Sequence, residues 1–142
     1  MDHVVYVSRS LKELDKLIAG GRSMLVRGST GKKVPYGKVN AGDRLFFATG
    51  NSTRNVVKAA ASAGEVYDSP KLSGIEPECL LAGHASELQL SDVEMAKWSV
   101  KKYLTLIALQ DFSPIVPFSI AARGDGETDD WIVLDNIDEI IE

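Results

Sequence analysis

Short apolar runs separated by turn residues dominate the start of the chain. Val4 to Val7 is β-branched and aromatic, which is typical of a strand. Four apolar residues between positions 11 and 18 recur at helical spacing and predict a helix that stops at Gly20. Ser10 and Glu13 have the spacing of a capping box for that helix. The chain is therefore expected to open with a strand, a helix and a stop.

Further strands joined by turns are predicted up to position 67. Ser23 to Arg27 and Leu45 to Ala48 are short apolar segments that each follow or leave a turn. Val34 to Tyr36 is predicted as a short extended segment after a glycine-rich basic turn. Val56 to Tyr67 contains helix-favouring alanines, but its valines and tyrosine favour a strand, which is our prediction.

The middle of the chain is predicted to be a connection followed by a helix. Residues 69–90 contain two prolines and scattered serines and glycines, with one short helix expected at about 78–82. Ser91 and Glu94 form a second capping-box pattern, which predicts a helix through about Trp98.

The last third is predicted to return to strands. Tyr103 to Phe112 is a nearly continuous apolar run expected of a central strand, and residues 115–120 carry Pro117 and are predicted as an edge strand. Trp131 to Leu134 can add a strand, and Asn136 can cap a terminal helical turn. The order of elements predicts an α+β fold, a small mixed β-barrel with two or three peripheral helices. Without repeats or a long linker, residues 1–142 are expected to form a single domain.

Composition places the chain among ordinary globular proteins. Of its 142 residues, 44% are hydrophobic and 25% charged. There is no apolar run of the ~18 residues that span a bilayer, and the N-terminus does not have the pattern of a secretory signal. The lone cysteine, Cys79, cannot form an internal disulfide. We therefore expect a cytoplasmic protein that does not associate with membranes.

Charge is distributed unevenly along the sequence. Residues 1–58 contain 11 Lys or Arg against 4 Asp or Glu, whereas residues 59–142 contain 5 against 16. An anionic ligand would be attracted to the first half, although a solvated surface with chance segregation explains the same counts equally well.

Two arginines on the predicted strand after the first helix are the best candidates for binding such a ligand. Arg22 and Arg27 carry guanidinium groups that remain charged and present a rigid fork of donors suited to phosphate. Arg44 follows the turn formed by Gly42 and Asp43 and could extend the same patch. Because arginine does not act as a base at ordinary pH, the pattern favours binding over catalysis.

The basic turn after this strand supplies further candidates. Lys32 and Lys33 follow a glycine-rich segment that could contact phosphate, but it lacks the glycine and hydroxyl positions of a nucleotide P-loop. Tyr36, Trp98 and Tyr103 lie near lysines, a combination that binds single-stranded nucleic acid by stacking. Core packing is the stronger expectation for Trp98, and Tyr36 is the best stacking candidate.

Metal and cofactor sites are not predicted. The acidic residues between 125 and 130 lack the glycine and glutamate positions of a calcium loop. Cys79 and His84 are too few for zinc, and we expect a buried thiol and a hydrogen-bonded histidine. No cofactor is expected.

The segment from Gly20 through Arg22 to Arg27, with a Gly-Asp turn before an apolar strand, resembles the ASCH domain of the PUA-like superfamily. The resemblance is densest over residues 4–67. It implies a small β-barrel with helices around an open cleft that is associated with RNA or modified nucleosides. Arg22 and Arg27 would line that cleft.

Some ASCH proteins hydrolyse acylated cytidines or cut RNA. The resemblance places Arg22 where the amidohydrolases have a lysine and Leu25 where they have a threonine nucleophile. Arginine cannot deprotonate a nucleophile and leucine cannot be one. This comparison favours a non-catalytic module.

The sequence is compatible with three functions. The leading one is an RNA- or nucleotide-binding module with a basic cleft formed by Arg22, Arg27, Lys32, Lys33, Tyr36 and Arg44. The alternative is a small hydrolase acting on a modified nucleoside or on RNA, with Ser23 or an unidentified residue as nucleophile and Glu87 as base. The third is an adaptor that binds a protein partner through its acidic C-terminal half, around Asp129 and Asp130.

Overall fold

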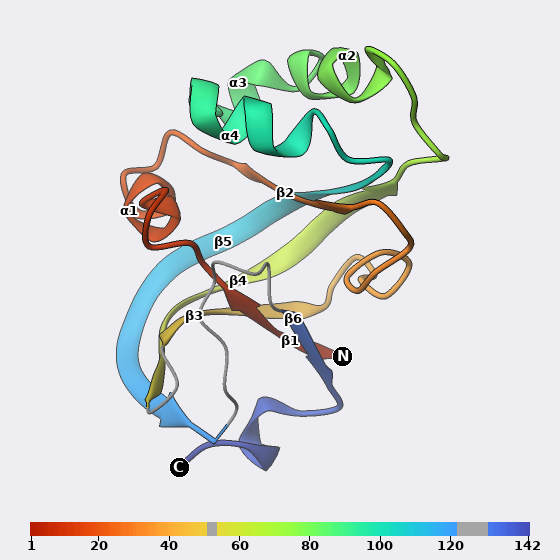
Figure 1. The fold of residues 1–142 in the computed structure, drawn as a ribbon. Coiled ribbons are helices and arrows are strands. Elements are labelled where there is room, and N and C mark those ends of the chain that lie inside the picture. The colour runs from red at the N-terminus through yellow and green to blue at the C-terminus, as the bar shows by residue number, and fades with distance from the viewer. Residues whose placement is uncertain (51–53, 122–130) are drawn as a thin grey trace.

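The computed structural model describes residues 1–50, 54–121 and 131–142. One mixed sheet organises these residues (Figure 1). Its strands are β1 (Asp2–Tyr6), β2 (Met24–Ser29), β3 (Arg44–Gly50), β4 (Asn55–Asp68), β5 (Tyr103–Ile120) and β6 (Trp131–Leu134). They are arranged in the order β2-β5-β4-β3-β1-β6, with β1 parallel to β3 and every other pair antiparallel.

The two longest strands bend the sheet into a half-barrel. β4 and β5 pair along their lengths, with register shifts between Val57 and Ala59 and at two further points. Such irregularities bend and twist a strand pair, and β5 curves strongly through Figure 1. In the described structure, the edge strands β2 and β6 are not paired with each other. This architecture confirms the α+β class predicted from the sequence, a mixed sheet with helices around it.

The separate strands predicted at 103–112 and 115–120 are one continuous strand. The first part of β5 lies between β2 and β4, whereas its second part pairs with β4 alone among the named strands. Pro117 lies in this second part. Proline has no backbone N–H to donate, and it is tolerated here because this part of the strand has a named strand on only one side. The division predicted between Phe112 and Ile115 is therefore wrong, whereas the edge position predicted for residues 115–120 is right.

Short helices lie on one side and at one end of the sheet. They are α1 (Glu13–Ile18), α2 (Glu76–Ala82), α3 (Ala85–Leu88) and α4 (Asp92–Trp98), and a 3₁₀ turn, η1, follows at Ile137–Glu139. Figure 1 shows α2, α3 and α4 grouped at the end of the sheet where β5 begins. The single helix predicted within 69–90 is in fact two, so the described residues contain four α-helices rather than two or three.

The helix caps were predicted with mixed success. Ser91 and Glu94 form the predicted capping box at α4, and Asn136 caps η1. The prediction for α1 is wrong, because Ser10 does not cap it. The N-cap of α1 is Lys12, which makes no side-chain cap bond, and Glu13 Oε1 accepts instead from the backbone N–H of Ser8 over 3.3 Å.

Apolar residues pack on both faces of the sheet. Leu25, Phe47 and Ile107 belong to a buried cluster that also contains Leu17 of α1. Leu104 packs with Trp98 and residues of α2 and α3 in a second cluster, which confirms the core position of Trp98. Burial of Leu25 explains why a leucine is found at this position of β2.

Candidate functional site

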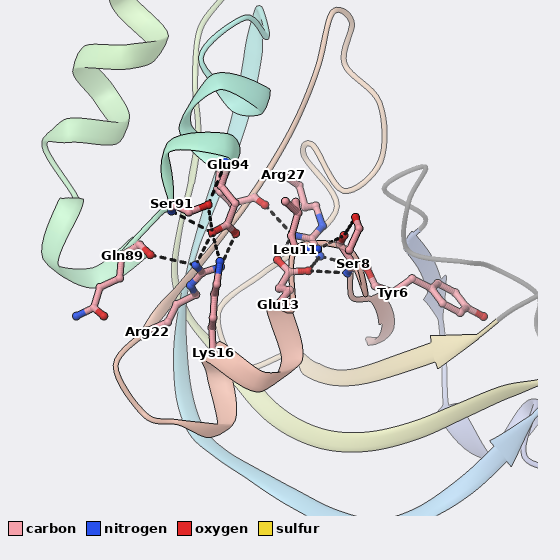
Figure 2. Close-up of polar contacts among 12 residues, drawn as sticks. Tyr6, Ser8, Leu11, Glu13, Lys16, Arg22, Arg27, Gln89, Ser91 and Glu94 are labelled. Atoms are coloured by element: carbon pink, nitrogen blue, oxygen red, sulfur yellow. Dashed lines mark hydrogen bonds and ion pairs between the residues drawn. The ribbon is translucent and has the colours of Figure 1, made fainter.

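Arg22 lies at the entrance to β2 and is enclosed by carboxylate and carbonyl oxygens. Its Nη1 and Nη2 each donate to Glu94 of α4 over 2.9 Å, and Nη2 also donates to the Gln89 carbonyl (Figure 2). Lys16 of α1 donates to the same glutamate over 2.7 Å. Only 3% of the Arg22 side chain is exposed. This cluster joins α1, β2 and α4.

The ionisation of Glu94 reflects this environment. Burial on its own would raise the pKa of Glu94, but hydrogen bonds from Arg22, Lys16 and the Ser91 backbone stabilise the carboxylate and lower its pKa to about 2. Glu94 is therefore charged at neutral pH and compensates the buried guanidinium.

Arg27 forms a second buried pair near the middle of the molecule. Its Nη1 and Nη2 donate to the two carboxylate oxygens of Glu13, each over 2.8 Å. Nη2 also donates to the carbonyl of Tyr6 in β1 over 3.2 Å. Because β1 and β2 are not neighbours in the sheet, this arginine bridges the open side of the half-barrel (Figure 2).

These contacts change the role that the sequence suggested for the two arginines. Both guanidinium groups are buried and each is held by a bidentate carboxylate. Sequence reasoning missed Glu13 and Glu94 as their partners. The available signal was the capping-box spacing of both glutamates, which predicts a carboxylate in the first turn of a helix, although only Glu94 forms that box. The lysines are therefore the stronger candidates for contacts with an anionic ligand.

A cavity of about 220 Å³ lies where β2 ends, β5 begins and the loop after β2 folds back. We call it the tyrosine cavity, and it is lined by Arg27, Gly28, Ser29, Gly31, Lys33, Val34, Pro35, Tyr36, Lys101, Tyr103 and Thr105. The loop is a series of turns around the buried Pro35, so the extended segment predicted at Val34 to Tyr36 is wrong.

Two tyrosine rings form one wall of the tyrosine cavity. Tyr36 and Tyr103 meet edge to face with centroids 5.4 Å apart. The Tyr36 hydroxyl donates to the Ser69 carbonyl, and the backbone N–H of Gly37 donates to Asp68 over 3.1 Å. These bonds hold the loop against the end of β4. Tyr36, the stacking candidate, is thus fixed in place beside a second ring.

Lysines surround the same rings. Lys32 Nζ lies 5.9 Å from the centroids of both Tyr36 and Tyr103. Lys33 and Lys101 line the tyrosine cavity, whereas none of its described lining residues is acidic. Lys101 lies 65 positions after Tyr36 in the sequence. Its place here could be suggested only by its position just before Tyr103.

Gly28 allows β2 and β5 to approach at the floor of the tyrosine cavity. A Cβ atom there would lie 2.6 Å from Leu104 Cδ2 and 3.0 Å from the Tyr103 carbonyl oxygen. Both distances are shorter than van der Waals contact, so a larger residue would displace β5 and with it the Tyr103 ring.

The remaining candidates lie elsewhere. Arg44 is paired with Asp2 and lines a different cavity with Phe46. Ser23 is exposed and Glu87 is half-buried; the backbone N–H of Ser23 donates to the Glu87 carbonyl, and neither residue lines the tyrosine cavity. Asp129 and Asp130 lie outside the described residues. The Cys79 thiol is exposed, which corrects the expectation that it is buried.

The described fold is similar to solved structures of an ASCH protein from Zymomonas mobilis. The crystal structure of that protein superposes with a TM-score of 0.59 at 14% sequence identity, over 82% of this chain and 71% of that chain. This chain has the ASCH fold. A tyrosine-to-phenylalanine variant of that ASCH protein gives a TM-score of 0.58 at 16% identity, over 82% and 73% of the two chains. No protein-family model and no curated protein matches the sequence.

The fold comparison confirms the ASCH resemblance that the Gly20-to-Arg27 segment indicated, at the level of the fold. In the described part of this ASCH fold, no helix is both long and apolar enough to cross a membrane.

Proposed function

We propose that this chain is an RNA- or nucleotide-binding module and that the tyrosine cavity holds one nucleotide of a single-stranded ligand. The observation that carries the proposal is the convergence of Tyr36, Tyr103 and three lysines from separate segments on one cavity. Aromatic rings can stack on any base, while ammonium groups attract the phosphate. The ASCH fold supports the proposal, since the resemblance implied a cleft associated with RNA.

The chemistry of the cavity favours binding over hydrolysis. Among its described lining residues there is neither a carboxylate nor an imidazole that could serve as a general base. The Thr105 hydroxyl donates to Asp68 over 2.9 Å, so it is committed to a structural bond. We therefore propose a module that binds without turnover, with the phosphate held by Lys33 and Lys101 and the base by the tyrosines.

The direct test is titration of a fluorescently labelled oligouridine, followed by anisotropy, with the wild-type protein and Tyr103→Leu. Removal of a stacking ring costs about 1–3 kcal/mol of binding energy, so the affinity should fall by about 5- to 150-fold. Tyr67→Leu is the matched control, because Tyr67 is an exposed tyrosine of β4 that lies outside the tyrosine cavity. Circular dichroism confirms that each variant is folded.

The outcomes separate clearly. Wild-type binding that weakens with salt, together with a loss confined to Tyr103→Leu, supports the proposal. Equal losses in both variants, or wild-type affinity that ignores salt, would overturn it.

A further inference from the structure

A second basic concavity lies beside the start of α1, the end of β3 and the start of β4. It consists of two adjoining cavities of about 320 and 290 Å³, which share Arg9, Thr49 and Lys58. Lys12 lines the first cavity and Arg54 lines the second. We call this combined surface the basic groove.

Its charge is strongly one-sided. Four cationic residues line the basic groove, and Asp15 is the single acidic residue among the described residues that line it. Lys12 and Lys58 are exposed, and neither forms an ion pair within the described structure. Two ammonium groups are thus available for an anionic ligand.

The lining residues indicate which part of a nucleic acid would fit. Unlike the tyrosine cavity, the basic groove has no aromatic ring among its described lining residues, but it has the hydroxyl of Thr49. Phosphate oxygens are contacted by lysine, arginine and hydroxyl groups, whereas stacking of bases requires rings. The groove therefore suits a phosphodiester backbone and not a base.

The buried pair of Arg27 and Glu13 lies between the two surfaces. Arg27 lines the tyrosine cavity and binds Glu13, and Glu13 accepts from the backbone of Ser8, which lines the basic groove. A short chain of contacts thus connects them across the open side of the half-barrel (Figure 2).

We infer that the basic groove holds the phosphodiester backbone of the same single strand whose nucleotide enters the tyrosine cavity. The inference rests on the proposed function and extends it from a site for one nucleotide to a longer track. It predicts that affinity rises with strand length, because only a longer strand reaches both surfaces.

The test compares oligouridines of about four and about twelve nucleotides, lengths within the range that single-stranded sites cover. The variant is Lys12→Asn combined with Lys58→Gln; asparagine is used because Lys12 has a φ of 53°, in the left-handed region that asparagine tolerates. The control, Lys38→Gln combined with Lys71→Gln, removes the same charge from exposed positions outside both surfaces.

The expected result is specific to the long strand. Wild-type protein should bind the longer oligouridine more tightly than the shorter one. The groove variant should abolish this gain and reduce the salt slope for the long strand by about 1–1.5, because each phosphate of a single strand that is no longer neutralised lowers the slope by ~0.7. Binding of the short strand should stay within twofold of the control.

Other outcomes separate the inference from the function on which it rests. Equal affinity for short and long strands, with the same affinity in the groove and control variants, would overturn the track. The proposal for the tyrosine cavity would be unaffected. A long strand that depends on the groove but not on Tyr103 would overturn the proposed function while retaining the groove as an anion site. Failure of the wild-type protein to bind either strand would overturn both.

Discussion

The buried arginines and the exposed lysines of this molecule have the same charge but opposite environments. Arg22 and Arg27 each form a bidentate ion pair with a glutamate inside the fold. Lys33, in contrast, lines an open cavity that has no acidic residue among its described lining residues. A buried charge must be paired because leaving water is costly, while an exposed ammonium remains solvated and able to exchange water for phosphate. The arginines are therefore structural elements, and the lysines are the candidates for ligand binding.

The difference also explains the architecture. Each arginine joins segments that the sheet alone would not join: Arg22, just before β2, binds Glu94 of α4, and Arg27 links β2 to β1. Because β2 is an edge strand, these contacts hold it on the half-barrel. They also fix the position of the end of β2, which lines the tyrosine cavity.

The largest effect should come from breaking one buried pair. Glu13→Gln keeps the shape of the side chain but leaves the Arg27 guanidinium buried without a charged partner, which should lower the free energy of unfolding by about 3–5 kcal/mol. Urea denaturation followed by circular dichroism measures this, with exposed Glu78→Gln as the control. A decrease below about 1 kcal/mol would show that the pair is not a structural staple.

An intermediate loss of stability is expected at acidic pH. The pKa of Glu94 is lowered from 4.5 to about 2 in the folded state, so its contribution is fully present above pH 4.5 and is lost as the pH falls toward 2. The shift corresponds to about 3 kcal/mol of unfolding free energy. Denaturation at several pH values should show this loss in the wild-type protein and a shallower dependence in Glu94→Gln. Equal slopes in the two proteins would contradict the assignment.

The smallest effect on stability should come from the cavity lysines. Lys33→Gln should change the free energy of unfolding by no more than about 0.5 kcal/mol. It should nevertheless reduce the salt slope of oligouridine binding by about 0.7, the value for one single-strand phosphate contact. Lys38→Gln, an exposed position of the same loop that does not line the tyrosine cavity, is the control. If both variants gave the same slope, Lys33 would not be a ligand-binding residue.

Local sequence was sufficient for most of the secondary structure. The strand at Val56 to Tyr67 and the capping box at Ser91 were predicted correctly, since strand-favouring residues and caps act over a few positions. The predicted cap at Ser10 and the predicted division between Phe112 and Ile115 were wrong. In both cases a contact between distant parts of the chain decided the outcome. The Glu13 carboxylate accepts from Arg27, and the part of β5 that contains Pro117 stays a strand because it pairs with β4.

The candidate site was only partly predictable for the same reason. The sequence by itself determined the order of strands and helices, the resemblance to ASCH domains, and the presence of Tyr36 and a basic segment in one turn. Only the tertiary structure decided which cations are enclosed, because the partners of Arg27 and Arg22 lie 14 and 72 positions away in the chain. Burial and pairing depend on such distant contacts, so the fold decided that glutamates enclose the two arginines and that Lys33, Lys101 and the two tyrosine rings line the open cavity.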